Sequence, residues 1–402
     1  MVITGHWLIA AYYYQAGELY FSDVLVIQPR TQWLTWLFQV MPIFFIVGGY
    51  ANAISLQSAR RREHDYATWL AARLHRLVSP LLILLLAWAV IALLMHFSGI
   101  SGEIIQRASR ASLIPIWFLA IYIMVVVLAP ATHKAWRRWG FWSFWMIGTI
   151  GVLVDVAFFA ADIRWLGWSN YFWVWLAVHQ LGYAWQSGRL GGPGRLLAYS
   201  LVSFLLLALL VNKGPYPLAM VGSPDADLSN SLPPKITLLV LGIGQLGLLL
   251  AVAAPMRRVL SGLRIWTATV LINSMIMTLY LWHLTVLIAI VGVLYLAGGF
   301  GLDLQPGTSA WWLARPLWIA VLYAALLPVT LLLSPLERRG RAADAAVPAA
   351  WRQVGGAVLI CLGVALVGRF GLANAPLPGL DVVAYLLIVA GAAIGGLLPA
   401  SR

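Results

Sequence analysis

At least ten separate apolar stretches, each long enough to cross a lipid bilayer, run through this chain of 402 residues. A hydrocarbon core about 30 Å thick needs roughly 20 apolar residues per spanning helix. Hydrophobic residues make up 62% of the chain and charged residues 10%, whereas soluble domains carry about 25% charged residues. A soluble fold could not bury so much apolar surface, so the sequence predicts an all-α, polytopic transmembrane helical bundle.

Charged residues, proline and glycine bound the expected spans. They lie near residues 1–16, 32–54, 77–97, 111–131, 141–161, 168–187, 196–212, 235–254, 265–297, 311–333, 350–369 and 381–399. The first run is short and has no charged flank, so we expect the chain to start inside a truncated helix. The ninth run is too long for one straight crossing, and a break near Asn273-Ser274 would separate an interfacial piece from a span.

These runs predict three regions along the chain. About ten core helices occupy residues 1–333, a basic cytoplasmic linker follows at 334–349, and residues 350–402 form an extra transmembrane helix pair. The single cysteine, Cys361, excludes an intramolecular disulfide and a cysteine-based zinc site, and no metal site is expected.

Basic residues are distributed unevenly between alternate loops. One set of loops holds 18 of the 26 lysines and arginines, and the other set holds 8 of them together with 8 of the 13 acidic residues. The basic set comprises 55–76, 132–140, 188–195, 255–264, 334–352 and Arg402. Short basic loops mark the cytoplasmic side, so both chain ends are expected in the cytosol. Because these charges form no stripe or tail, nucleic acid is not expected as a partner.

His6, in Gly5-His6-Trp7, lies inside the first apolar run. Ionisable groups at that depth are costly and usually functional. An imidazole that burial keeps neutral can accept a proton as a general base. The alternative is a histidine that only hydrogen-bonds between helices, and this residue alone leaves both interpretations open.

Arg73 and Arg76 lie three residues apart and therefore project from one helical face at the cytoplasmic foot of the third span. Two guanidiniums suit a phosphate-bearing ligand, because the Arg fork matches phosphate bidentately. The alternative is ordinary basic flanking that contacts lipid headgroups, reinforced by the neighbouring Arg60-Arg61-Arg62.

Several other polar and aromatic residues within the spans could line an acceptor pocket. Each also has a structural alternative, either packing between helices or membership of an interfacial aromatic belt. The candidates are Gln39, Asn52, Trp117, Asn273, Tyr280 and His283, with Asn273 seven residues before Tyr280 on roughly the same helical face. Asp155 and His179 are expected to pair with each other or with backbone.

Three blocks in order resemble the family 3 membrane acyltransferases, a bacterial group that includes O-antigen acetylases. Ile3-Thr-Gly5-His6-Trp7 is similar to the end of that family's first helix, which carries the catalytic histidine. Phe44-Phe45-Ile-Val-Gly48-Gly49-Tyr50 followed by Arg73-Leu-His-Arg76 is similar to its glycine-containing helix and Arg-x-x-Arg motif. Leu279-Tyr280-Leu-Trp282-His283 is similar to its late Tyr-Leu-x-His signature, and the order and spacing fit over about residues 1–333.

The resemblance implies transfer of an acyl group, commonly acetyl, from cytosolic acyl-CoA to a hydroxyl of an envelope carbohydrate, a lipid or a secreted molecule. It implies His6 as the catalytic residue, Arg73 and Arg76 as ligands of the CoA phosphates, and a place in the bacterial cytoplasmic membrane. Acyl-CoA would be a co-substrate, with no resident cofactor. The family also places an arginine ten residues before this histidine, which would fall upstream of Met1. Either the chain starts late in its reading frame, or this copy has lost that arginine.

Two other functional classes remain open at this point. Twelve spans with intramembrane histidine and aspartate also suit a proton-coupled transporter or flippase without covalent chemistry. The chain shows no related halves, however, which such carriers often have. A catalytically inactive relative that serves a partner enzyme is the third class, and loss of the upstream arginine would favour it.

The charge distribution generates a test of membrane orientation. Single cysteines placed within 17–31 and 213–235 should react with a membrane-impermeant thiol reagent on whole cells, and cysteines within 132–140 should be protected. The opposite labelling pattern would reverse the orientation and place the arginine pair on the wrong side for cytosolic acyl-CoA.

Overall fold

The apolar runs form helices in the computed structural model, which describes residues 1–222, 227–337, 346–372 and 380–398. Eight helices in these ranges are long and apolar enough to cross a membrane. The count is nine if α11 (Ile236–Ala251) and α12 (Ala253–Leu260), bent by 59° at Val252, form one span. The predicted polytopic helical membrane protein is confirmed.

The first apolar run departs from the predicted helix over 1–16. Helix α1 covers Val2–Ile9, and a two-stranded sheet follows, formed by β1 (Ala10–Gln15) and β2 (Glu18–Asp23). The turn residues Ala16 and Gly17 have φ angles of 51° and 89°, as a two-residue hairpin with the twist of its strands requires. The aromatic run Tyr12-Tyr13-Tyr14 favours a strand over a helix. The prediction is therefore wrong beyond Ile9.

The long ninth run breaks where the sequence predicts. Helix α13 (Leu263–Ser274) ends and α14 (Ile276–Leu296) begins on either side of Met275, which lies outside helical geometry at φ −116° and ψ 10°. The predicted break near Asn273-Ser274 is confirmed. The predicted linker 334–349 differs, because α15 (Ser309–Glu337) continues into it, and residues 338–345 lie outside the described residues.

The chain divides into two compact units. The first comprises Met1–Val2, Asp23–Arg62 and Leu128–Ile272. Its remaining elements are α2 (Val24–Ile27), η1 (Pro29–Leu34), α3 (Thr35–Phe38), α4 (Met41–Arg61), α8 (Phe141–Ala160), η2 (Arg164–Ser169), α9 (Asn170–Gln186) and α10 (Pro193–Lys213).

The second unit comprises Ile3–Ser22, Glu63–Val127 and Asn273–Arg402. Besides α1, the hairpin, α14 and α15, it holds α5 (Tyr66–Phe97), α6 (Gly102–Ser112), α16 (Ala350–Phe370) and α17 (Val382–Ile394). Helix α7 (Ile116–Trp139) supplies residues to both units.

Close contact between α4 and α9 organises the first unit. A Cβ atom added at Gly49 would lie 1.9 Å from the backbone oxygen of His179, and one added at Gly182 would lie 2.1 Å from that of Ile46. The Phe45 and Trp175 rings stack beside this crossing, with centroids 4.4 Å apart. Glycine is required at both positions because the two backbones touch.

A buried carboxylate ties α8 to the start of α11 in the same unit. Asp155 accepts hydrogen bonds from the Ile236 backbone N–H at 2.8 Å, from the Asn170 amide at 2.9 Å and from the Tyr216 hydroxyl at 3.1 Å. An anionic side chain at a helix N-terminus satisfies a backbone donor that has no partner within the helix. Asp155 is therefore a structural residue, and it pairs with backbone as the sequence suggested.

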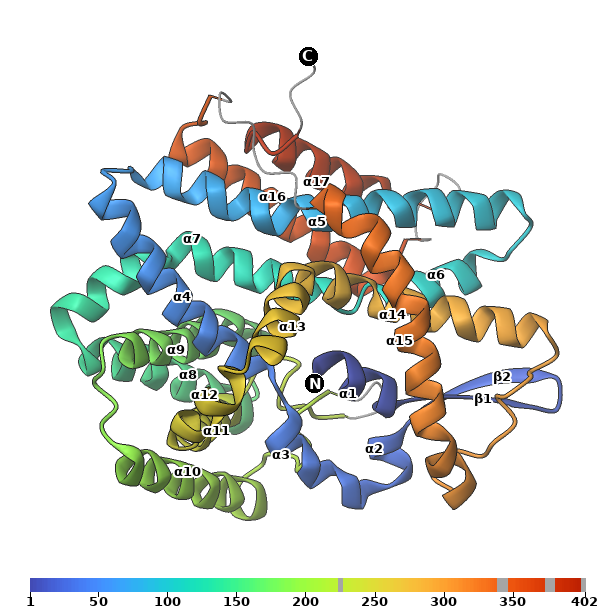
Figure 1. Ribbon diagram of the computed structural model, residues 1–402, viewed down its shortest axis with the longest axis horizontal. Coiled ribbons are helices and arrows are strands. Elements are labelled where there is room, and N and C mark those ends of the chain that lie inside the picture. The colour runs from blue at the N-terminus through green and yellow to red at the C-terminus, as the bar shows by residue number, and fades with distance from the viewer. Residues whose placement is uncertain (223–226, 338–345, 373–379, 399–402) are drawn as a thin grey trace. The chain divides into compact units, whose positions relative to one another are not determined.

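Helix α5 is the central element of the second unit. The Asp65 carboxylate caps its N-terminus through the Thr68 N–H at 2.8 Å, and hydrogen bonding to Thr68 lowers the pKa of Asp65. The terminal pair α16 and α17 lies beside this helix (Figure 1). The Gln353 amide donates to the Ala67 carbonyl at 3.0 Å, and the Tyr385 hydroxyl donates to the Leu85 carbonyl at 2.7 Å. The extra helix pair thus packs against the helix that carries the Arg-x-x-Arg motif.

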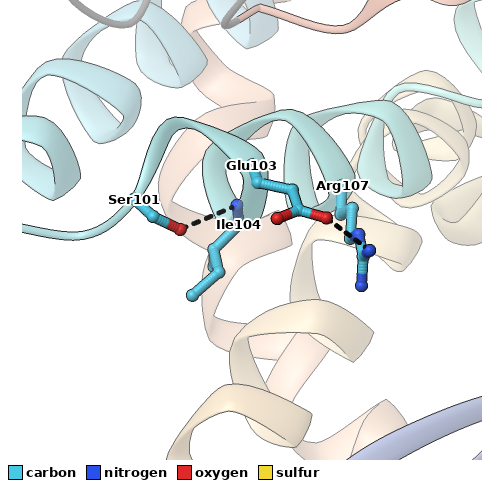
Figure 2. Close-up of polar contacts among 4 residues, drawn as sticks. All are labelled: Ser101, Glu103, Ile104 and Arg107. Atoms are coloured by element: carbon cyan, nitrogen blue, oxygen red, sulfur yellow. Dashed lines mark hydrogen bonds and ion pairs between the residues drawn. The ribbon is translucent and has the colours of Figure 1, made fainter.

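The short helix α6 is amphipathic and carries exposed charges. Figure 2 shows its first turn, where the Ser101 hydroxyl caps the Ile104 N–H and Arg107 pairs with Glu103 one turn earlier. Both charged side chains are largely exposed, at 78% and 68%, so this ion pair contributes little to stability.

The α4–α9 contact generates a stability prediction. Gly182→Ala should lower the thermal unfolding midpoint of the purified protein by several degrees, because overpacking costs about 1–3 kcal/mol and backbone is what the added methyl group meets. Gly292→Ala in α14 is the matched control, since nothing lies within 4 Å of a Cβ atom there. Equal midpoints for the two variants would contradict this account of the crossing.

Candidate functional site

The second unit brings two histidines together that are 277 residues apart in the sequence. His6 Nδ1 on α1 lies 2.8 Å from His283 Nε2 on α14, and the two ring planes are within 14° of each other. His283 is completely buried, whereas His6 is half-buried. Of the pair, His6 is therefore the imidazole that a substrate can reach.

The hydrogen bonds around the pair fix the tautomers of two neutral imidazoles. His283 Nδ1 lies 2.5 Å from the backbone oxygen of Tyr280. A carbonyl oxygen only accepts, so His283 carries its hydrogen on Nδ1 and offers the Nε2 lone pair. His6 Nδ1 must then donate to His283 Nε2, which leaves the His6 Nε2 lone pair free. That lone pair is what a general base or a nucleophile requires.

Trp7, next to the histidine, anchors α1 within the unit. Its indole N–H donates to the His283 backbone oxygen at 3.1 Å, and its side chain is completely buried. The Tyr323 ring on α15 meets the Trp7 ring edge-on, with centroids 4.8 Å apart, and the Tyr323 hydroxyl lies 2.7 Å from Thr4 Oγ1. By contrast, no atom lies within 4 Å of a Cβ built at Gly5. Helix α1 is therefore held firmly on its Trp7 side and has open space beside Gly5.

Tyr280 lies beside His283, with ring centroids 5.9 Å apart, whereas Asn273 is not on the same helix. The Tyr280 hydroxyl donates to the Pro115 carbonyl at 3.1 Å, and its ring packs edge-on against Phe118 at 5.6 Å. Trp117 precedes that phenylalanine and is half-buried. Asn273 is exposed and lies on α13, before the break at Met275. The predicted shared face of Asn273 and Tyr280 is wrong, because the break interrupts the helical register.

Arg73 and Arg76 lie in the third turn of α5. Arg73 is half-buried and Arg76 is exposed. The Arg73 guanidinium carbon lies 6.0 Å from the centre of the Trp69 ring, one turn earlier on the same face. At this distance the indole attracts the guanidinium weakly through a cation–π interaction, and the N–H donors of Arg73 stay available.

Gln39, Asn52 and His179 belong to the first unit, where protein groups engage each of them. The Gln39 amide donates to the Met220 carbonyl at 3.1 Å, and Asn52 Nδ2 lies 3.1 Å from His179 Nε2. All three side chains are buried. Asp155 and His179 therefore do not pair with each other, and that alternative is wrong.

Two features of the second unit were not identified from the sequence, a hydrogen bond between α5 and α14 and a buried arginine on α15. The Trp88 indole on α5 donates to Thr285 Oγ1 at 3.0 Å, two residues beyond His283. Arg315 on α15 is 8% exposed. An arginine inside an apolar run was a detectable signal, because intramembrane charge is usually functional.

Comparison with known proteins places these residues in a family. The chain matches no curated protein and no solved structure. Residues 1–335 match the family model described as the acyltransferase domain Acyl_transf_3, a range that contains the histidine pair, both arginines of the Arg-x-x-Arg motif and Arg315. The chain is a multi-pass membrane protein that belongs to the acyltransferase 3 family.

Proposed function

We propose that this protein transfers an acyl group from acyl-CoA to a hydroxyl group of an envelope carbohydrate, a lipid or a secreted molecule, with His6 as the general base. One observation carries the proposal, namely the hydrogen-bond chain from His6 through His283 to the Tyr280 carbonyl. Family membership supports acyl transfer over a carrier without covalent chemistry.

In this mechanism His6 Nε2 takes the proton of the acceptor hydroxyl as its oxygen attacks the thioester carbonyl carbon. The new C–O bond forms, the C–S bond breaks, and the proton passes to the departing CoA sulfur. The imidazole is then neutral again, so atoms and charges balance. General base catalysis of this kind is worth roughly 10²–10⁴-fold in rate.

His283 acts here as a positioning residue rather than as part of the acceptor pocket. Its Nε2 accepts from His6, its Nδ1 hydrogen is held by backbone, and its side chain is completely buried. It fixes the His6 tautomer and stabilises the positive charge that His6 gains when it takes the proton. Because backbone orients His283, this support does not depend on the identity of the residue 280 side chain.

Arg73 and Arg76 bind the CoA phosphates in this proposal. Along α5 they precede Trp88, which contacts Thr285 beside the histidine pair, by 15 and 12 residues. At 1.5 Å rise per residue these positions are about 18–22 Å apart. A donor held by its phosphates at one end and reacting at the other must therefore have a long extended arm, as the phosphopantetheine arm of CoA is.

The histidine pair can be tested by substitution. His6→Ala should reduce acetyl transfer at least about 100-fold, while acetyl-CoA binding, measured by calorimetry, persists. His283→Leu should lower kcat with little change in the KM for acetyl-CoA. His283→Gln should recover part of that loss, because its amide oxygen can still accept from His6 Nδ1.

His64→Ala is the matched control, because His64 is exposed, and its activity should be unchanged. All variants are assayed with any upstream coding sequence included, where the resemblance places a further arginine. A His6→Ala protein that transfers acetyl groups at near the parental rate would contradict the catalytic assignment. ¹⁵N spectra of labelled histidine should show His6 and His283 each protonated at Nδ1 alone.

The arginine pair has its own test. Arg73→Ala should weaken acetyl-CoA binding at least tenfold, and Arg76→Lys should also weaken it, since an ammonium cannot reproduce the bidentate fork. Arg258→Ala in α12, another exposed basic residue of the predicted cytoplasmic loops, should leave the affinity unchanged. If both α5 variants bound acetyl-CoA with wild-type affinity, the two arginines would be ordinary basic residues that flank a membrane span and not CoA ligands.

A further inference from the structure

Trp311, Arg315 and Trp318 form a cluster on one face of α15, in the same unit as the histidine pair. Their spacing of four and three residues places them one above another on a helix. Trp311 is completely buried and Arg315 is 8% exposed. The guanidinium carbon lies 3.8 Å from the centre of the Trp311 ring and 5.5 Å from that of Trp318. A positive charge is thus held between two indoles.

The hydrogen-bonding groups of this cluster are unused by the described part of the chain. Arg315 Nε, Trp311 Nε1 and Trp318 Nε1 are each buried without a hydrogen-bond partner there. No described carboxylate lies within 4.0 Å of the guanidinium. Among the buried side-chain atoms that lack a partner in the described residues, Arg315 Nε is the one from a permanently charged group. An unpaired buried charge is strongly destabilising unless something compensates it.

We propose that Arg315, held between Trp311 and Trp318, binds an anionic group, phosphate or carboxylate, of the acyl acceptor. This inference rests on the acyl-transfer function proposed above. Stacking on the indoles engages the face of the guanidinium and leaves its in-plane N–H fork directed away from the rings. That fork matches a phosphate or carboxylate bidentately.

The position of the cluster along α15 fits an acceptor rather than the CoA phosphates. Eight residues after Arg315, Tyr323 contacts Trp7 and Thr4 of the helix that carries His6. The axial separation of Arg315 and Tyr323 is about 12 Å at 1.5 Å per residue. The loop before α15 belongs to the set predicted to face away from the cytosol. An anion bound at Arg315 would therefore approach His6 from the side opposite to the cytosolic donor.

Binding, measured without any transfer reaction, tests this site. The purified full chain in an uncharged detergent is titrated with glucose 1-phosphate, glucuronate, uncharged glucose and dihexanoyl phosphatidylglycerol, and the affinity is taken from the rise in thermal unfolding midpoint. We expect at least one anionic probe to bind, glucose not to bind detectably, and Arg315→Gln to weaken the binding at least tenfold. Arg107→Gln is the matched control, because Arg107 is an exposed arginine paired with Glu103 (Figure 2).

Each outcome decides the proposal. Arg315-dependent binding of the sugar anions identifies a glycan acceptor, and dependence confined to phosphatidylglycerol identifies a lipid headgroup. Equal affinities of the wild-type protein and Arg315→Gln for every anionic probe, or binding to none of them, would overturn the site. If Arg315→Gln fails to fold, Arg315→Lys is used in its place. We expect Arg315→Lys to bind the anionic probes at least threefold more weakly, and an unchanged affinity would overturn the site. His6→Ala should retain the binding, so a failure of acyl transfer is distinguishable from a failure here.

Discussion

The hydrogen bond between His6 and His283 is the interaction on which the candidate site depends. This hydrogen bond forms only if the short helix α1, which ends at Ile9, is held against α14. Trp7 holds it there, because its indole N–H donates to the backbone oxygen of His283. His283 therefore makes two hydrogen bonds to α1. Its backbone carbonyl accepts from the Trp7 indole, and its ring nitrogen accepts from His6. Because both contacts converge on His283, a shift of α1 along α14 would break them together. The position of His6 is thereby specified more tightly than packing alone would achieve.

The sequence predicts much of this architecture because the bilayer restricts the choices. A run of about 20 apolar residues has few options other than a spanning helix, and the break between α13 and α14 follows from a run too long for one crossing. The hairpin after α1 was missed because the apolar run continues through Tyr12-Tyr13-Tyr14, and hydropathy does not distinguish a strand from a helix. Local geometry at Ala16 and Gly17, with positive φ at both, decided the outcome.

The site was predictable only in part, because sequence identifies residue types and not their partners. His6 and His283 were both candidates, but they were assigned to separate roles, and 277 residues of chain conceal their contact. Asn273 was placed beside Tyr280 by helical periodicity, which fails across a break. Gln39 and Asn52 are polar residues in an apolar span, as pocket residues often are, yet backbone and His179 engage them. Only contacts distinguish a polar group that holds helices together from one that meets a substrate.

An enzyme that joins a cytosolic donor to an acceptor on the other side of a membrane must bind charged groups at two depths and react between them. Under the proposed function, the arginines of the second unit would supply these two binding positions. Helix α5 carries the arginine pair near its start and meets α14 through Trp88 and Thr285, beside the histidine pair. Helix α15 carries Arg315 about 12 Å along its axis from the residue that contacts α1. Desolvating a cation is costly, and a nearby indole offsets part of that cost, with the Trp311 ring 3.8 Å from Arg315 and the Trp69 ring 6.0 Å from Arg73. In the proposed function, an anionic ligand at each of these arginines completes the charge compensation that the nearby indole begins.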